Sequence, residues 1–182
     1  KVPTNKIINT TGYLSDLFKP SNEIGKINLT PQQKQEAQQQ YSQYLNTIFP
    51  DSKVKDIVYH VSKNKFEKFD DKFIGANKIQ NSPDNDLGIF FTKDVSYIKL
   101  QDSEKELGNN IYSVVVNLKN PNLNYYEVLD KFIPGLYEKD YTSEKSRVYY
   151  QQTKEWMLSN NQDGIIESAR PFVVAFKSSQ VH

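Results

Sequence analysis

The chain contains no cysteine among its 182 residues. This absence excludes disulfide bonds, thiolate metal centres and a cysteine nucleophile. Histidine is almost as scarce, because His60 is the only one inside the chain and His182 is the last residue. A zinc site needs several His, Cys or carboxylate ligands at fixed spacing, which one internal histidine does not supply. Any chemistry that requires an imidazole therefore falls to His60.

A strong charge bias and long apolar runs are also absent. Lysine and arginine number 23 and the acidic residues 22, so the formal net charge is +1. The basic residues form no stripe, which disfavours nucleic acid as a partner. No apolar run reaches the length of about 18 residues that a membrane span needs. We therefore expect a soluble protein without a membrane partner.

The glycine-dependent signatures of common enzyme classes are missing as well. The 7 glycines build neither a Gly-x-x-x-x-Gly-Lys loop nor a Gly-x-Gly-x-x-Gly turn, which excludes P-loop and Rossmann nucleotide sites. There is no Gly-x-Ser-x-Gly elbow to present a nucleophilic serine. No spacing among the acidic residues singles out a catalytic pair.

Aromatic residues are plentiful, with 12 Tyr and 10 Phe, and can build a core although aliphatic residues are few. The length predicts one domain with an added N-terminal segment. We expect an irregular segment followed by an amphipathic helix over residues 1–50, and the main domain over 51–182. The chain begins at Lys1 rather than Met, so we expect a processed product or part of a longer polypeptide.

The first strong helix signal is "TPQQKQEAQQQYSQYLNTIF", residues 30–49. Thr30 is a natural N-cap, Pro31 fits the first helical position, and Gln33 completes a capping box. An apolar stripe at helical spacing follows. Its members are Ala37, Tyr41, Tyr44, Leu45 and Ile48.

Short runs of β-branched and aromatic residues, bounded by turn formers, follow this helix and predict strands. They cover residues 56–62, 87–92, 111–119, 163–167 and 171–176. Two further helices are expected, a short one over 94–104 and a longer one over 142–161. This order favours an α+β domain with a largely antiparallel sheet, in which we expect strands 163–167 and 171–176 to form a hairpin.

Five short motifs occur in one order: "VYHVS", "GIFFT", "LKNP", "DGII" and "VAFKSSQV". Together they resemble the ADP-ribosyltransferase fold, in the histidine branch that includes the poly-ADP-ribose polymerases and diphtheria toxin. Within this branch, the motifs most resemble those of small bacterial and phage-borne transferase domains. The resemblance covers residues 56–182. It implies a split β-sandwich with NAD⁺ as substrate in the cleft between two sheets, and no metal.

The resemblance also assigns roles to residues. His60 matches the histidine that hydrogen-bonds the ribose next to nicotinamide, and Val61 and Ser62 follow it where the family has Gly and then Ser or Thr. Phe90 stands where a tyrosine of the nicotinamide pocket usually lies. The polymerases have a second tyrosine eleven residues further on, where this chain has Gln101. We therefore expect Tyr97, the nearest aromatic residue, to be the stacking partner. The implied NAD⁺-binding set is His60, Val61, Ser62, Phe90, Phe91, Thr92 and Tyr97.

The family's catalytic glutamate has no counterpart in register, because Phe172 occupies its position. Glu167 is the acidic residue nearest to it in sequence, and we expect Glu167 to be the functional acid if the expected hairpin brings it close to Phe172. Asp163 and Glu127 remain open as alternatives, and so does a purely structural role for each of these carboxylates.

The resemblance therefore implies an NAD⁺-dependent mono-ADP-ribosyltransferase that modifies a macromolecular acceptor, in particular a protein. A toxin, effector or phage-associated role would fit, with an immunity or antitoxin protein as a further partner and delivery by bacteria or phage, including secretion. One alternative is a catalytically inactive binding or structural module with the same fold. Another is an RNA 2′-phosphotransferase, which the neutral charge disfavours.

Overall fold

The structure is a computed structural model that describes residues 30–76, 83–94, 97, 110–132 and 143–182. In this part of the chain it is an α+β domain, with one five-stranded antiparallel sheet in the order β3-β1-β2-β5-β4 and three α-helices. The strands are β1 (Val58–Ser62), β2 (Ile89–Thr92), β3 (Asn110–Val114), β4 (Gly164–Ile166) and β5 (Phe172–Ala175). The helices are α3 (Pro31–Ile48), α6 (Tyr125–Phe132) and α7 (Ser143–Ser159), and 3₁₀ turns span Asp71–Phe73, Pro83–Asp86 and Ser178–Gln180.

The predicted strands and long helices are present, and β4 and β5 form the expected hairpin. The third strand is shorter than the predicted 111–119. After Val114 the chain leaves β1 and pairs with the C-terminal residues, since Val116 bridges Val181 and the backbones of Val115 and His182 exchange two hydrogen bonds of 2.8 Å. The expected irregular segment and most of the helix predicted over 94–104 lie outside the described residues.

Helix α6 is an element that the sequence analysis did not predict. Its apolar residues Tyr125, Val128, Leu129 and Phe132 follow the i, i+3, i+4, i+7 pattern of an amphipathic helix. Asn122 precedes it, and its side-chain oxygen accepts a hydrogen bond from the Asn124 backbone N–H at 2.9 Å. The apolar pattern spans only eight residues, so the sequence signal for this helix is short.

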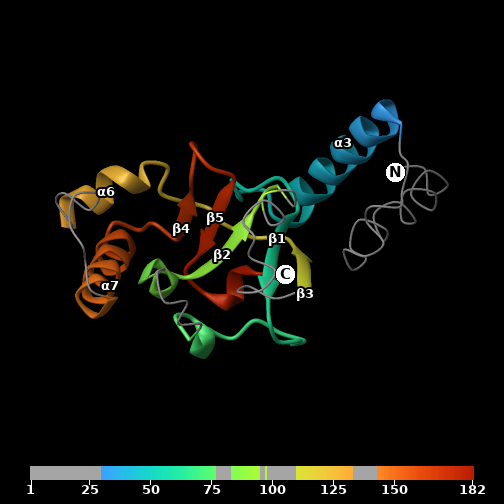
Figure 1. Cartoon of the computed structure of the whole chain (residues 1–182). Coiled ribbons are helices and arrows are strands. Elements are labelled where there is room, and N and C mark those ends of the chain that lie inside the picture. Colours follow the sequence, from blue (N-terminus) through green and yellow to red (C-terminus); the bar gives the residue numbers. More distant parts are fainter. Residues whose placement is uncertain (1–29, 77–82, 95–96, 98–109, 133–142) are drawn as a thin grey trace.

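Two sets of side chains alternate along the strands and bury the two faces of the sheet. On one face, which we call the loop face, Val58, Phe91, Val114 and Val173 belong to one apolar cluster. The opposite face, the helix face, is covered by α6 and α7 at the β4 end and by α3 at the β3 end (Figure 1). No helix in the described ranges is long and apolar enough to cross a membrane.

The ladder between β1 and β2 is the weak point of the sheet. Strands β2 and β5 have four paired residues and β1 and β3 have five, whereas β1 and β2 have only the pair Tyr59 and Thr92. Figure 1 shows β1 and β2 meeting at one end and diverging toward the other. Over most of their length the two strands therefore do not pair with each other.

Candidate functional site: a pocket where β1 and β2 diverge

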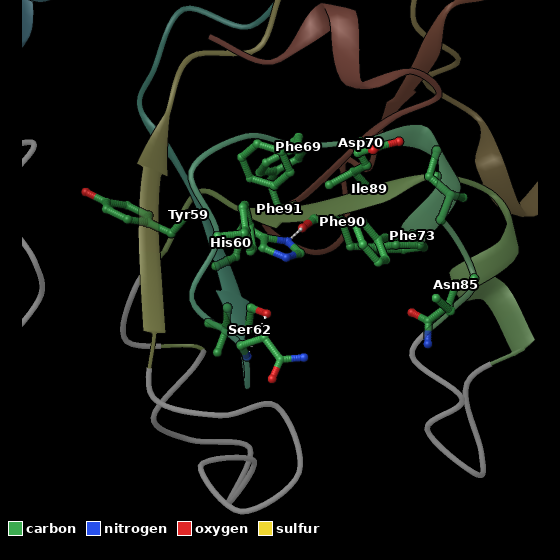
Figure 2. A pocket seen from close by; sticks show the side chains of 18 of the residues that line it. Tyr59, His60, Ser62, Phe69, Asp70, Phe73, Asn85, Ile89, Phe90 and Phe91 are labelled. Atoms are coloured by element: carbon green, nitrogen blue, oxygen red, sulfur yellow. Dashed lines mark hydrogen bonds between the residues drawn. The ribbon is translucent and has the colours of Figure 1, made fainter.

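A cavity of about 370 Å³ lies in the gap between β1 and β2 (Figure 2). This volume falls within the range of about 300–1,000 Å³ that is typical of small-molecule pockets. The loop after β1, residues 63–76, which we call the β1 loop, forms a second wall. The apolar part of the lining comprises Val61, Phe66, Phe69, Phe73, Ile74, Ile89, Phe90, Phe91 and Phe172.

The His60 side chain connects β1 to β2 where the two strands lack backbone hydrogen bonds. Its Nδ1 lies 2.9 Å from the backbone oxygen of Phe90. A carbonyl oxygen can only accept, so Nδ1 must carry the proton, and in the neutral ring Nε2 is then an acceptor. Figure 2 shows the second ring nitrogen on the side of the cavity. The pocket therefore holds one oriented hydrogen-bond acceptor among apolar walls.

Aromatic side chains surround the His60 ring. The centroids of Phe69 and Phe91 lie 5.2 and 5.8 Å from it, and those of Phe66 and Tyr112 lie 6.1 and 6.4 Å away. Burial in this setting lowers the pKa of His60 below its usual value of 6.5, although the bond to Phe90 opposes the shift. His60 is accordingly neutral at pH 7.

The β1 loop is fastened to β3 by side-chain contacts. The ring of Phe66 stacks on Tyr112 with centroids 4.1 Å apart, and the Tyr112 hydroxyl accepts a hydrogen bond from the Phe66 backbone N–H at 2.8 Å. The amide of Asn110 donates to the backbone oxygens of Ser62 and Lys63, each at 3.0 Å. These contacts hold the loop wall of the pocket in one arrangement.

All seven residues that the resemblance assigned to NAD⁺ binding line this one cavity. They differ in how far their side chains are available. Phe91 is 2% exposed and belongs to the core of the loop face. The hydroxyl of Thr92 is engaged in a turn with the backbone of Asp94, at 3.1 Å in both directions. Phe90 is half-buried and more accessible than Phe91, and its side chain also packs against the apolar cluster of the helix face.

Phe172 also lines the cavity, at the position where the resemblance implies a glutamate. It pairs with Thr92 across the β2–β5 ladder. Its ring meets Tyr97 edge to face, with centroids 5.1 Å apart. The residue at this position is therefore an aromatic wall of the pocket.

Glu167 lies outside the pocket although it is next to Phe172 in the hairpin. Its backbone N–H donates to the Phe172 oxygen at 3.0 Å. Its carboxylate is 8% exposed and accepts a hydrogen bond from the Tyr126 hydroxyl at 2.8 Å, with Arg170 Nε 3.6 Å away. Tyr126 belongs to α6 on the helix face, whereas His60 lies on the loop face. The structure therefore does not bring Glu167 and His60 together.

The two alternative acids do not line the cavity either. The Asp163 carboxylate accepts hydrogen bonds from the backbone N–H groups of Lys119 at 2.7 Å and Asn120 at 3.0 Å, which ties the start of β4 to the turn before α6. Glu127 is exposed on α6. Among the described lining residues, Asp70 is the one carboxylate.

The described part of the chain contains no group of three or more His, Asp or Glu side chains that could hold a metal ion. The pocket offers aromatic side chains, the neutral imidazole and polar side chains such as those of Asn64 and Asn85. A flat heterocycle with a hydroxyl-bearing substituent matches this set, because its ring can stack on phenylalanines and its hydroxyl can donate to His60 Nε2.

Several lining residues were missed in the sequence analysis. Phe66, Phe69 and Phe73 lie in the β1 loop, where "KFEKFDDKF" repeats an aromatic residue every three or four positions. That spacing in a polar loop was the signal for an aromatic wall, in which Phe66 and Phe69 pack inward and Phe73 stays 63% exposed.

Comparison of the chain with protein-family models, with curated proteins and with solved structures gave no match.

Proposed function

We propose that this chain is an NAD⁺-dependent mono-ADP-ribosyltransferase whose His60 pocket binds the nicotinamide and the adjoining ribose. The observation that carries the proposal is the oriented, neutral His60 within an aromatic cavity at the divergence of two strands. The resemblance of the sequence motifs to the ADP-ribosyltransferase fold supplies the substrate, and the split between β1 and β2 supports that fold.

In this proposal the ring of nicotinamide packs between the aromatic walls that include Phe90 and Tyr97. A ribose hydroxyl donates a hydrogen bond to His60 Nε2, which orients the sugar. Burial favours this arrangement, because a protonated imidazole would have no acceptor for the hydroxyl. Positioning of this kind accelerates a reaction by removing the entropy cost of alignment.

The reaction breaks the bond between C1′ of the ribose and the nicotinamide nitrogen. Nicotinamide leaves as a neutral molecule with the bonding electron pair, and the acceptor forms a new bond to C1′. A neutral acceptor group then loses its proton to solvent or to a base, whereas a carboxylate acceptor has no proton to lose. Positive charge develops on the ribose on the way, and a nearby negative charge stabilises it.

The negative charge does not come from the two positions that the sequence analysis considered first. Phe172 provides none, and the Glu167 carboxylate is bound to Tyr126 on the other face. An acidic side chain of the acceptor protein can supply it, since a carboxylate nucleophile approaches C1′ directly. This favours a protein acceptor with Asp or Glu at the modified position, and transfer of single ADP-ribose units.

A second function is favoured by the same observation. With Phe172 in place of an acid, the pocket can bind NAD⁺ or a related nucleotide without transfer, as a binding module of a larger assembly. Both functions require His60 and the aromatic walls. They differ in whether nicotinamide is released.

The test is nicotinamide release from NAD⁺, measured with and without a cell lysate as the source of acceptor. Wild type is compared with His60→Ala, Glu167→Gln, and the matched pair Phe172→Glu and Phe172→Gln. The pair differs only in a carboxylate at the pocket wall, so it isolates the effect of charge on the chemical step.

For the transferase we expect release that depends on acceptor, is lost in His60→Ala and is retained in Glu167→Gln. Phe172→Glu should release nicotinamide at least about tenfold faster than Phe172→Gln, because each 1.4 kcal/mol of transition-state stabilisation gives a factor of ten. Binding of NAD⁺ without release by wild type would favour the binding module. Absence of both binding and release would overturn both functions.

A further inference from the structure

The lining of the His60 pocket includes two lysines that the function proposed above does not use. Lys65 and Lys68 line the cavity, and both are exposed. Neither forms an ion pair with any residue in the described ranges. As far as the described residues are concerned, their ammonium groups are therefore available to an incoming anion.

The one carboxylate of the described lining does not cancel this charge. Asp70 forms an ion pair of 2.9 Å with Lys72, and its oxygen accepts the Lys72 backbone N–H at 3.0 Å. The hydrogen bonds from Lys72 lower the pKa of Asp70. Lys72 compensates the negative charge of Asp70, so this charge does not offset the positive charges of Lys65 and Lys68. The charged side chains of the described lining, Lys65, Lys68 and Asp70, therefore sum to a net positive charge.

Both lysines lie on a stretch of backbone that is held in place. Lys65 stands between Asn64, whose backbone N–H donates to the Ser62 hydroxyl at 3.2 Å, and Phe66, which is stacked on Tyr112. Lys68 precedes Phe69, whose ring packs against the core of the loop face. A fixed backbone lowers the entropy cost of bringing both side chains to one ligand group.

We infer that Lys65 and Lys68 bind the diphosphate of the ligand whose heterocycle occupies the aromatic pocket. The inference rests on the proposed function and extends it to the phosphate-bearing half of NAD⁺. The lining combines half-buried and buried aromatic side chains around His60, which suit an uncharged ring, with two exposed lysines, which suit an anion. A nucleotide carries both kinds of group, and lysine ammonium groups are common phosphate ligands.

The experiment is a set of calorimetric titrations with NAD⁺, ADP-ribose, ADP and nicotinamide. The proteins are wild type, Lys65→Gln, Lys68→Gln, the double variant, and Lys63→Gln. Lys63 is the matched control, because it is exposed on the same loop but does not line the cavity. Nicotinamide carries no phosphate and reports on the aromatic part of the pocket alone.

We expect each single variant to bind NAD⁺ and ADP-ribose about fivefold more weakly, and the double variant about twentyfold, as for solvent-exposed charge pairs. Lys63→Gln should match wild type, and nicotinamide should bind all five proteins equally. The difference between wild type and the double variant should shrink at high salt, because exposed charges are screened.

The outcomes separate this inference from the proposed function. NAD⁺ binding that is equal in wild type and the double variant would overturn the inference and leave the function standing. An equal loss of nicotinamide binding in the double variant would also overturn it, since the lysines would then act on the shape of the pocket. Failure of wild type to bind NAD⁺, ADP-ribose and ADP would overturn both.

Discussion

The two ladders formed by β2 are built differently. Toward β5 the strand has four paired residues, and the helix face behind them is closed by α6 and α7. Toward β1 it has one pair, and the Phe90 carbonyl is bound by the His60 side chain instead of a strand. The β2–β5 ladder stabilises the sheet, whereas the β2–β1 ladder has little backbone pairing and leaves a cavity. A candidate site thus forms where the sheet is least complete.

The largest effect is expected from a substitution that creates a cavity in the half of the sheet where β2 and β5 are fully paired. Ile165 of β4 is 1% exposed and packs with Met157 and Val174. We expect Ile165→Ala to lower the free energy of unfolding by about 3 kcal/mol, because both the buried surface and the packing are lost. Urea denaturation measures the loss, and Val148→Ala, at a side chain that is 52% exposed, is the control with little change. A loss no larger than the control's would mean that this half does not hold the fold together.

The second test concerns the buried carboxylate of the same half. We expect Glu167→Ala to lower the free energy of unfolding by about 2 kcal/mol, because the Tyr126 hydroxyl loses its acceptor. Tyr126→Phe removes the same bond from the other side and should cost at least as much, because the buried Glu167 carboxylate then keeps, among the described residues, only Arg170 Nε at 3.6 Å. NAD⁺ affinity should be unchanged in both variants. A loss of nicotinamide release without a loss of stability in Glu167→Gln would instead make Glu167 the acid, as the sequence predicted.

The third test uses the protonation of His60 in the incomplete half. Its pKa is lowered by burial in the folded chain and stands at 6.5 when exposed. The unfolded chain therefore binds more protons below pH 6.5, and the stability that neutral His60 contributes is present above pH 6.5 and lost as the pH falls through the folded pKa. Denaturation of wild type and His60→Asn between pH 8 and 5 measures this. A constant difference between the two proteins across that range would contradict the lowered pKa.

The smallest effect on the free energy of unfolding is expected when the contacts of Arg147 with Asp86 and Gly75 are removed. Arg147 of α7 forms an ion pair of 3.2 Å with Asp86 and donates to the Gly75 oxygen at 3.5 Å. We expect Arg147→Gln to cost no more than about 1 kcal/mol, as is typical for a partly exposed pair. The pair of Lys119 and Asp51, at 3.7 Å and well exposed, should cost nothing measurable when broken. If denaturation shows the same loss of stability for both ion pairs, the contacts of Arg147 contribute no more than an ordinary surface pair.

Much of the fold was predictable from local patterns. The β-branched and aromatic runs marked five strands, and the Thr30–Pro31 cap marked the start of α3. The end of β3 was not predictable, because Val115 and Val116 continue the apolar pattern while their backbone changes partner to the C-terminal residues. Helix α6 was missed because its eight residues offer only two turns of periodicity.

The candidate site was predictable in its residue types and less so in its geometry. The motif order identified the residues around His60 that now line one cavity. Closeness in sequence to Phe172 made Glu167 the favoured acid, but a side chain's face in a hairpin depends on register, and the partner that binds Glu167 is Tyr126, 41 residues away. The positive charge of the lining depends on how the β1 loop folds back onto β3, which no local pattern encodes.

The most direct test of the central claim is a calorimetric titration of NAD⁺ into wild type and His60→Ala, with circular dichroism of both to establish that they are folded. The account predicts saturable binding at one site in wild type and at least about tenfold weaker binding in the variant, because the ribose hydroxyl loses its buried acceptor. Equal affinity in the two proteins, or no saturable binding by wild type, would contradict the assignment of the His60 pocket as an NAD⁺ site.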